Sequence, residues 1–578
     1  MAPPMQKASD NIWDQVLSLL FEQSPLKNNE ENLKRNTVIY RRSKRLRNGD
    51  AIIPRGRLSD VSSETWQHIY SEIETRSKTW STPVTCGQPT KEAVAVFHLQ
   101  RPHAFQHVLK LVQTQGNQYG LISDRQGDNI FLNCSHINTQ QNKSLDHLEH
   151  VREIILLDHI MKLLTATGYS VAGIISDSNQ WDAELLQMLN ATHISEKIVD
   201  ASLPCGSSVV QSTLCQAAKK SNFRHHFPTD SAVTPNKDDS VQNHIVLDLK
   251  NYLDSEEGKC ERIKGFDKNL HLVKVTEGDD PTLLMLRVSQ LDSCSKVLQQ
   301  KEDQPVRCCL HLVPSSAIYV QQQIHLVWKI LSENCKQLQQ AQVVFGGTTK
   351  RKSPKEPIDC VTAEEYVRLR KLQMENAAAL KYGDDVSKGI EWDHMIKNLT
   401  EACMKFEILS TNCRNPLKLD LSDTSKNMED HVDNCGGPFV MYNCARLAML
   451  FRKFDEDVKN GIYPSLPNLS QCDMSLLKLE EEWTLLYNFV EPYPSLVQST
   501  VPTIGDCLYL NIQTHKVTGF LVSLSHCLSS YYSRVHVLGE PRRHLLPLMY
   551  ARLHLLTAVH QVMLNGLQLL NIEPASQL

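Results

Sequence analysis

The sequence predicts a multidomain protein in which an α/β core with a parallel sheet is followed by an all-helical bundle. The chain has 578 residues, more than one hydrophobic core accommodates. A strand pattern, a long helix pattern and a second strand pattern follow one another over residues 129–175, which is the order of a βαβ unit. Helical periodicity dominates from about residue 360 to the end.

The composition is that of a globular protein with little average charge. Hydrophobic residues make up 41% and charged residues 22%, and the formal net charge is -4. A nucleic-acid binder with this balance needs local basic patches. The 17 cysteines form no Cys-x-x-Cys pair, so we expect small buried hydrophobes in a reducing compartment rather than zinc ligands. No signal peptide or apolar run of about 18 residues is visible, which favours a cytoplasmic location without a membrane partner.

Residues 1–125 predict a small α+β module with a basic arm. Residues 11–23 have the apolar spacing of a helix, and residues 93–99 have that of a strand. Residues 34–57 carry nine basic residues against one acid. Such a run is typical of a solvated or disordered arm, a nuclear-import signal or a phosphate contact surface. The candidate RNA-backbone contacts in this run are Arg41, Arg42, Lys44, Arg45 and Arg47.

Residues 126–360 predict the α/β core. A helix is expected over 145–166 and a strand over 170–175, with further strands over 243–249 and 306–313. Residues 200–240 are rich in Ser, Asn, Asp and Lys and predict a long loop or an insertion. A helix is expected over 322–332.

Residues 390–578 predict the helical bundle, which a helix over 362–381 precedes. The segment 412–437 is polar and predicts a loop, and helix ends are expected at Gly461, Pro464 and Pro492. The helices of the bundle are predicted over 393–408, 438–459, 474–490, 503–534 and 543–571.

Three stretches of this bundle resemble the anticodon-binding domain of arginyl-tRNA synthetases, the DALR domain. Residues 437–447 read Gly-Pro-Phe-Val-Met-Tyr-Asn-Cys-Ala-Arg-Leu, similar to the start of a family helix. Residues 482–494 carry an acid-x-x-Leu-Leu pattern with a following proline. Residues 520–572 contain a Tyr-Tyr…Val-Leu stretch, an Ala-Arg-Leu helix and a closing Gly-Leu-Gln-Leu-Leu-Asn-Ile. Three matches in the family's order form a specific signal, which implies a degenerate class I synthetase-like (Rossmann-like) core before an all-α DALR domain.

The first nucleotide-binding motif of class I synthetases, His-Ile-Gly-His, is altered here. The stretch His147-Leu-Glu149-His150 stands in its place, so glutamate replaces the glycine. A side chain at that position is expected to fill the space of the adenine, and its charge would repel triphosphate oxygens. We interpret the two histidines as surface or packing residues. Metal ligation is an alternative, although no third ligand accompanies them at a useful spacing.

The second motif, Lys-Met-Ser-Lys-Ser, is absent as a signature. Only basic character remains near its expected position, at Lys350 and Lys352, which predict either a solvated loop or a contact with the tRNA backbone. We therefore expect a pseudo-enzyme related to arginine-tRNA ligase, with no catalytic residue, no cofactor and no metal.

The candidate tRNA-binding residues are aromatic and arginine side chains of the helical domain. Unpaired bases stack on aromatic or guanidinium planes, and arginines hold phosphates. Tyr442 and Tyr532 could instead be core residues, and Arg446 and Arg552 could be buried partners of acids. The residues predicted to contact tRNA are Tyr442, Arg446, Tyr531, Arg534, Arg542, Arg543 and Arg552.

Residues 439–448 and 531–541 look like a vertebrate relative of the synthetase rather than the enzyme itself. This resemblance implies recognition of particular arginine tRNAs and their delivery to a methyltransferase that forms 3-methylcytidine in the anticodon loop. Composition and spacing do not point to that partner, and no DNA partner is expected. Two alternatives are an arginyl-tRNA synthetase with residual aminoacylation and a protein-interaction scaffold without RNA.

Overall fold

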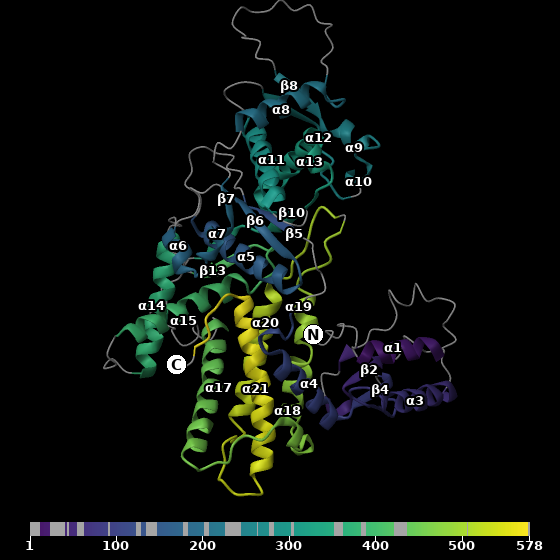
Figure 1. Ribbon diagram of the computed structural model, residues 1–578, viewed down its shortest axis with the longest axis vertical. Coiled ribbons are helices and arrows are strands. Elements are labelled where there is room, and N and C mark those ends of the chain that lie inside the picture. The colour runs from purple at the N-terminus through teal and green to yellow at the C-terminus, as the bar shows by residue number, and fades with distance from the viewer. Residues whose placement is uncertain are drawn as a thin grey trace, which may run out of the picture.

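A computed structural model places an insertion at one end of the molecule, the helical bundle at the other end and a parallel sheet between them (Figure 1). An N-terminal module lies beside the bundle. The structure describes residues 12–23, 41–42, 46–54, 63–90, 93–122, 129–134, 147–176, 183–200, 207–225, 244–262, 264–276, 282–301, 306–351, 362–382, 389–420, 436–505 and 507–575.

The N-terminal module contains a four-stranded antiparallel sheet in the order β1-β2-β4-β3. Trp13 and Val16 of α1 are buried, as the helical spacing of residues 11–23 predicts. The elements of the module are α1 (Ile12–Gln23), β1 (Arg41–Arg42), β2 (Ala51–Pro54), α3 (Ser63–Ser77), β3 (Val84–Gly87), β4 (Ala93–Leu99) and α4 (Arg101–Gln115).

The core sheet is parallel and has the strand order β11-β10-β5-β6-β7. Because β5, the first strand of this sheet along the chain, lies at its centre, the sheet is doubly wound. Such a sheet binds ligands at the carboxyl ends of its strands, where the winding reverses between β5 and β10. The βαβ prediction is confirmed. The elements are β5 (Asn129–Asn133), α5 (His147–Ala166), β6 (Ser170–Ser176), β7 (Ile198–Asp200), β10 (Val306–Pro314), α12 (Ile318–Leu331) and β11 (Gln339–Phe345).

The insertion between β7 and β10 has a hydrophobic core of its own, shared with the outer face of the sheet. The prediction of a loop over 200–240 is wrong for residues 207–220, which form α8. Leu214 and Ala218 of this helix are buried, and the helix packs against α11. Residues 226–243 lie outside the described residues. The helices α6 (Ala183–Met188) and α7 (His193–Lys197) precede the insertion, between β6 and β7. The insertion comprises α8 (Ser207–Lys220), β8 (His244–Asp248), α9 (Leu249–Asp254), α10 (Lys259–Arg262), β9 (Leu272–Thr276) and α11 (Leu283–Lys301).

The bundle matches most of the predicted helices. The predicted helix 474–490 is interrupted, with a π-helical turn at η8. Its main elements are α14 (Ala363–Tyr382), α15 (Ile390–Ile408), α17 (Gly436–Lys459), α18 (Glu480–Thr484), η8 (Leu485–Val490), α19 (Tyr493–Gln498), α20 (His515–Tyr532) and α21 (Leu546–Leu569).

Two extended segments of the bundle pair with the core. The predicted helix 503–534 begins only at residue 515, because the preceding chain forms a bridge between Tyr509 and Gln342 of β11. The Gln342 N–H donates to Leu508 O at 2.7 Å, and the Leu510 N–H donates to Gln342 O at 2.9 Å. The strand β13 (Leu417–Asp420), in the predicted 412–437 loop, pairs in parallel with β12 (Thr348–Arg351).

The N-terminal module is joined to the bundle through a buried carboxylate. Asp50 accepts hydrogen bonds from the Leu99 N–H at 2.8 Å and from Trp483 Nε1 at 2.7 Å. Tyr487 donates to the backbone carbonyl of Asp50 at 2.9 Å. Nearby, Arg101 pairs with Glu480 at 2.9 Å. Among the described residues, no helix is both long and apolar enough for a membrane crossing.

Candidate nucleic-acid interface

A groove opens along α17 beside the chain that leaves α20. Its volume is about 570 Å³, and we call it the α17 groove. Aromatic, apolar and basic side chains share its wall, which is the mixture that stacks unpaired bases and binds phosphate. The lining residues are Tyr442, Ala445, Arg446, Met449, Leu450 and Lys453 of α17, and Tyr532, Ser533, Val535, His536, Val537 and Leu538.

Arg446 is held between two aromatic rings in this groove. Its guanidinium lies 4.5 Å from the ring centroid of Tyr442 and 5.0 Å from that of Tyr532. One N–H donates to the Tyr442 hydroxyl at 2.7 Å. Both contacts restrict the guanidinium, so it is ordered before any ligand arrives. Burial raises the pKa of Tyr532, while the charge of Arg446 opposes that shift.

The arginines predicted after α20 lie at the surface. Arg534 is 59% exposed and pairs with Glu481 at 2.9 Å. Arg542 is 64% exposed and pairs with its neighbour Glu540, and Arg543 is exposed. Because exposed ion pairs contribute little, a polyanion can displace these acids from the arginines.

Tyr531 and Arg552 lie inside the bundle, which corrects their assignment to the RNA surface. Tyr531 is fully buried and donates to Glu482 Oε1 at 3.3 Å. Arg552 Nε donates to the same oxygen at 2.8 Å. Arg552 thus pairs with a buried acid, while 16% of its own side chain stays exposed. Successive residues of a helix point about 100° apart, so Tyr531 faces the core while Tyr532 faces the groove.

The basic positions outside the bundle stay predictions. The structure describes the backbone of Arg41 and Arg42 in β1, of Arg47 in a 3₁₀ turn, and of Lys350 in β12. Lys44, Arg45 and Lys352 lie outside the described residues.

The altered nucleotide motif forms the first turn of α5, where His147 is the first residue. Glu149 is half-buried against the carboxyl end of β11. A Cβ built on Gly347 would lie 3.3 Å from Glu149 Oε1. His150 Nδ1 lies 3.7 Å from the buried carboxylate of Glu153. The glutamate thus lies at the carboxyl ends of the strands, where a doubly wound sheet binds its ligand.

Arg152 bridges the core and the bundle, a role that sequence reasoning missed. Its Nη1 donates to Gly346 O and Gly347 O at 2.5 and 3.1 Å, just after β11. Its Nη2 donates to Cys413 O and Asn415 O at 3.0 and 2.8 Å, beyond α15. Burial lowers the pKa of this guanidinium, while nearby Cys413 and Glu149 oppose that shift.

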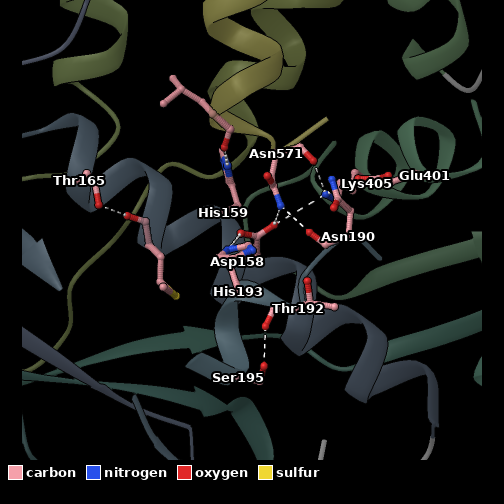
Figure 2. Close-up of polar contacts among 12 residues, drawn as sticks. Asp158, His159, Thr165, Asn190, Thr192, His193, Ser195, Glu401, Lys405 and Asn571 are labelled. Atoms are coloured by element: carbon pink, nitrogen blue, oxygen red, sulfur yellow. Dashed lines mark hydrogen bonds and ion pairs between the residues drawn. The ribbon is translucent and has the colours of Figure 1, made fainter. Parts of the chain in front are cut away.

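Asp158, further along α5, joins the same two bodies (Figure 2). It accepts a hydrogen bond from Asn571 at 3.1 Å, lies 2.9 Å from His193 Nε2 and forms an ion pair with Lys405 at 3.7 Å. Burial would raise the pKa of Asp158, but the hydrogen bond from His193 and the charge of Lys405 hold it below its usual value. We call Asp158, His193, Glu401, Lys405 and Asn571 the Asp158 joint.

Comparisons with known proteins agree with this architecture. Residues 440–578 match the model of the family described as the DALR anticodon binding domain. The chain is 30% identical over 507 residues to a *Mus musculus* protein, with 86% of each chain covered. It is 29% identical over 551 residues to a *Danio rerio* protein, with 93% of this chain and 92% of that one covered. Both relatives are named DALR anticodon-binding domain-containing protein 3.

Solved arginyl-tRNA synthetases share the fold over nearly the whole length. The *Thermus thermophilus* structure has a TM-score of 0.59 at 13% identity and covers 98% of this chain and 100% of that one. The *Plasmodium falciparum* structure has a TM-score of 0.61 at 11% identity, with 98% and 99% covered. The chain therefore has a class I, arginyl-tRNA synthetase-like fold with a C-terminal DALR helical domain. It belongs to the DALR anticodon-binding domain-containing protein 3 family.

Proposed function

We propose that this protein is a tRNA-binding adaptor, which recognises particular arginine tRNAs and presents their anticodon loop to a methyltransferase that forms 3-methylcytidine. The observation that carries the RNA-binding step is the α17 groove in the matched DALR domain, where Arg446 is ordered between two tyrosine rings. Unpaired bases stack on such planes, and the exposed arginines beyond α20 supply phosphate contacts. The methyltransferase partner comes from the sequence resemblance.

We further propose that the protein does not aminoacylate tRNA. Glu149 places a carboxylate at the nucleotide end of the sheet, and Arg152 draws the chain at residues 413–415 onto the carboxyl end of β11. Both features oppose the binding of a triphosphate. The carboxylate repels it by like charge, and the backbone of residues 413–415 fills space at the carboxyl end of β11.

The groove is tested by Arg446→Ala, with Arg452→Ala as the matched control. Arg452 is an exposed arginine of the same helix that does not line the groove. The dissociation constant for an arginine tRNA, measured at fixed salt, should rise on the order of tenfold in the first variant, because one stacking plane contributes roughly 1–3 kcal/mol. The dissociation constant of the control should change by less than about twofold, because Arg452→Ala removes one phosphate contact at most. Equal affinities for both variants would contradict the assignment of the groove.

The flanking arginines are tested together. Changing Arg534, Arg542 and Arg543 to Glu should abolish tRNA binding and leave the melting temperature nearly unchanged, because all three are exposed. Normal binding by this variant would show that the phosphate contacts lie elsewhere.

The adaptor step is tested by crosslinking and sequencing the RNA bound in cells, with the co-purifying proteins identified in the same preparation. Recovery of a few arginine tRNAs together with a methyltransferase is the expected result. Arginine-dependent exchange of pyrophosphate into ATP would instead support an active synthetase. Recovery of no tRNA would favour a protein-interaction scaffold.

A further inference from the structure

We propose that Arg152 and Asp158 are positioning residues for RNA binding, which fix the orientation of the helical bundle on the α/β core without contacting RNA. This inference rests on the proposed function for its RNA readout. Its structural basis is that α5, a helix of the core, carries successive polar side chains whose partners belong to the bundle.

The Arg152 guanidinium divides its four bonds equally between the two bodies. Gly346 and Gly347 follow β11, while Cys413 and Asn415 follow α15 of the bundle. The fit is close, because a Cβ on Gly346 would lie 2.6 Å from the carbonyl carbon of Asn415. Four donors in one rigid plane therefore fix both the distance and the angle between these chains.

The Asp158 joint is a second, separate attachment on the same helix. Lys405 is 1% exposed, and it donates to Asn571 O at 2.8 Å and pairs with Glu401 at 2.7 Å. Asn571 in turn donates to Asn190 O of the core at 2.7 Å. Asn571 has a left-handed backbone, with φ of 53°, and Figure 2 shows its side chain pointing toward Asp158 of α5.

His159, the next residue of α5, contacts the bundle through both ring nitrogens. Nδ1 lies 2.8 Å from Leu569 O and Nε2 lies 3.0 Å from Thr514 O. Three side chains of α5 thus reach α15, the start of α20 and the end of α21. Apolar packing alone is non-directional, whereas hydrogen bonds and the ion pair of Asp158 with Lys405 have a preferred geometry, so these contacts define the orientation of the bundle.

Orientation matters because a folded tRNA is large relative to either body. The α17 groove lies on the bundle, whereas the predicted basic positions Arg41 and Lys350 lie in the N-terminal module and at the end of the core. An RNA that contacts several of these positions at once gains affinity only while their separation is fixed.

The test compares Arg152→Lys with Arg370→Lys in the full chain. Lysine keeps the charge but has no planar fork. Arg370 is the matched control, because it is also a buried arginine, yet its partner is the Glu407 carboxylate at 2.7 Å and it joins α14 to α15 within the bundle. Labels at Lys220 of α8 and Lys459 of α17, both exposed, report the distance between the insertion and the far end of the bundle.

The expected result is a shifted or broadened label distance and an affinity for arginine tRNA weakened about tenfold in Arg152→Lys, with both quantities unchanged in Arg370→Lys. Asp158→Asn, which keeps a side chain of the same shape, should give the same pattern and serves if Arg152→Lys does not fold. An unchanged distance and affinity with a lowered melting temperature would overturn the inference. If the wild-type chain binds no tRNA, the proposed function fails, while the distance still decides whether α5 sets the orientation.

Discussion

Glu482 shows how one buried charge decides which of its neighbours can face solvent. Its carboxylate is completely buried and accepts hydrogen bonds from Arg552, Tyr531 and the Leu479 N–H. An isolated charge in this position would be costly, so the arginine and the tyrosine are committed to the interior. Tyr442, Arg446 and Tyr532 remain for the groove.

Arg552→Ala should lower the free energy of unfolding by about 3–5 kcal/mol, because it leaves Glu482 buried without its cation. Urea unfolding measures this loss. Arg543→Ala, at an exposed arginine, should change stability by less than about 0.5 kcal/mol. A small loss for Arg552→Ala, combined with weaker tRNA binding by the folded protein, would return this residue to the RNA surface.

Contacts between side chains were predictable from the sequence where they depend on local spacing. Tyr442 and Arg446 are four residues apart on a helix, and they do meet. Arg552 was misplaced because its partner lies 70 residues away, and no local pattern reports such a pairing. Arg152 was visible as part of the altered motif, but its four acceptors are backbone carbonyls, which leave no mark in the sequence.

At the scale of a single helix, α17 shows why the first family-like stretch begins with a glycine, Gly437. A Cβ on this residue would collide with the carbonyl oxygen of Ala402 on α15. The missing side chain thus lets α15 and α17 approach each other closely. These two helices pack against each other extensively.

Gly437→Ala should destabilise the protein by roughly 1–3 kcal/mol, because α15 must move away. Gly519→Ala is the control on α20, where a new Cβ would meet nothing within 4 Å. It should stabilise the protein by about 0.5–1 kcal/mol through helix propensity and a less flexible unfolded chain. Thermal melts of the two variants should therefore shift in opposite directions, and a shift in the same direction would contradict the packing argument.

In the insertion, Glu261 connects the short helix α10, to which it belongs, to α12. It lies 3.4 Å from His325 and 3.4 Å from Lys264, with Lys329 at 4.0 Å. Burial would raise the pKa of Glu261, but the bond from His325 and the lysine charges lower it to about 2. The folded-state pKa is below the unfolded value of 4.5, so the stabilisation is present above that value and is lost as the pH falls toward 2.

Glu261→Gln should therefore remove roughly 2–3 kcal/mol of stability near neutral pH. The difference between wild type and variant should shrink between about pH 5 and pH 2. Chemical unfolding at a series of pH values measures it. A difference that stays constant over this range would show that the carboxylate charge contributes nothing there.

At the scale of the whole molecule, the N-terminal module, the α/β core and the bundle share one hydrophobic core. The hydrophobic core runs from Trp13 of the N-terminal module through α5 to the helices of the bundle. Trp483 stacks on Tyr487 at 5.2 Å between ring centroids, and both bond to Asp50 of the module. The DALR domain therefore depends on surfaces that its own helices do not provide.

A fragment of residues 436–578 should not fold stably on its own, because it would expose the faces of Trp483, Tyr487 and Tyr493 that the rest of the chain covers. Circular dichroism during heating should show no cooperative transition, whereas the full chain should melt cooperatively. A fragment with a sharp transition would show that the bundle is an independent domain.

The order of the bodies and the class of fold were predictable, because they follow from helix and strand periodicity and from motifs along the chain. The boundaries at 125, 360 and 390 stay predictions. The returns of residues 417–420 and 508–510 to the core were not predictable. These strands are short, and their pairing depends on partners more than 60 residues away.

The bridge at Tyr509 has a consequence for how copies of this chain behave toward one another. The strand β11 is buried over most of its length and would be the open edge of the sheet. An open, apolar edge is a template on which a second chain can add a strand. Residues 508–510 cover it with main-chain hydrogen bonds, so the loop that ties the bundle to the core also keeps the sheet from growing between molecules. Loosening that loop would therefore raise the tendency of the protein to aggregate, even if every helix remained folded.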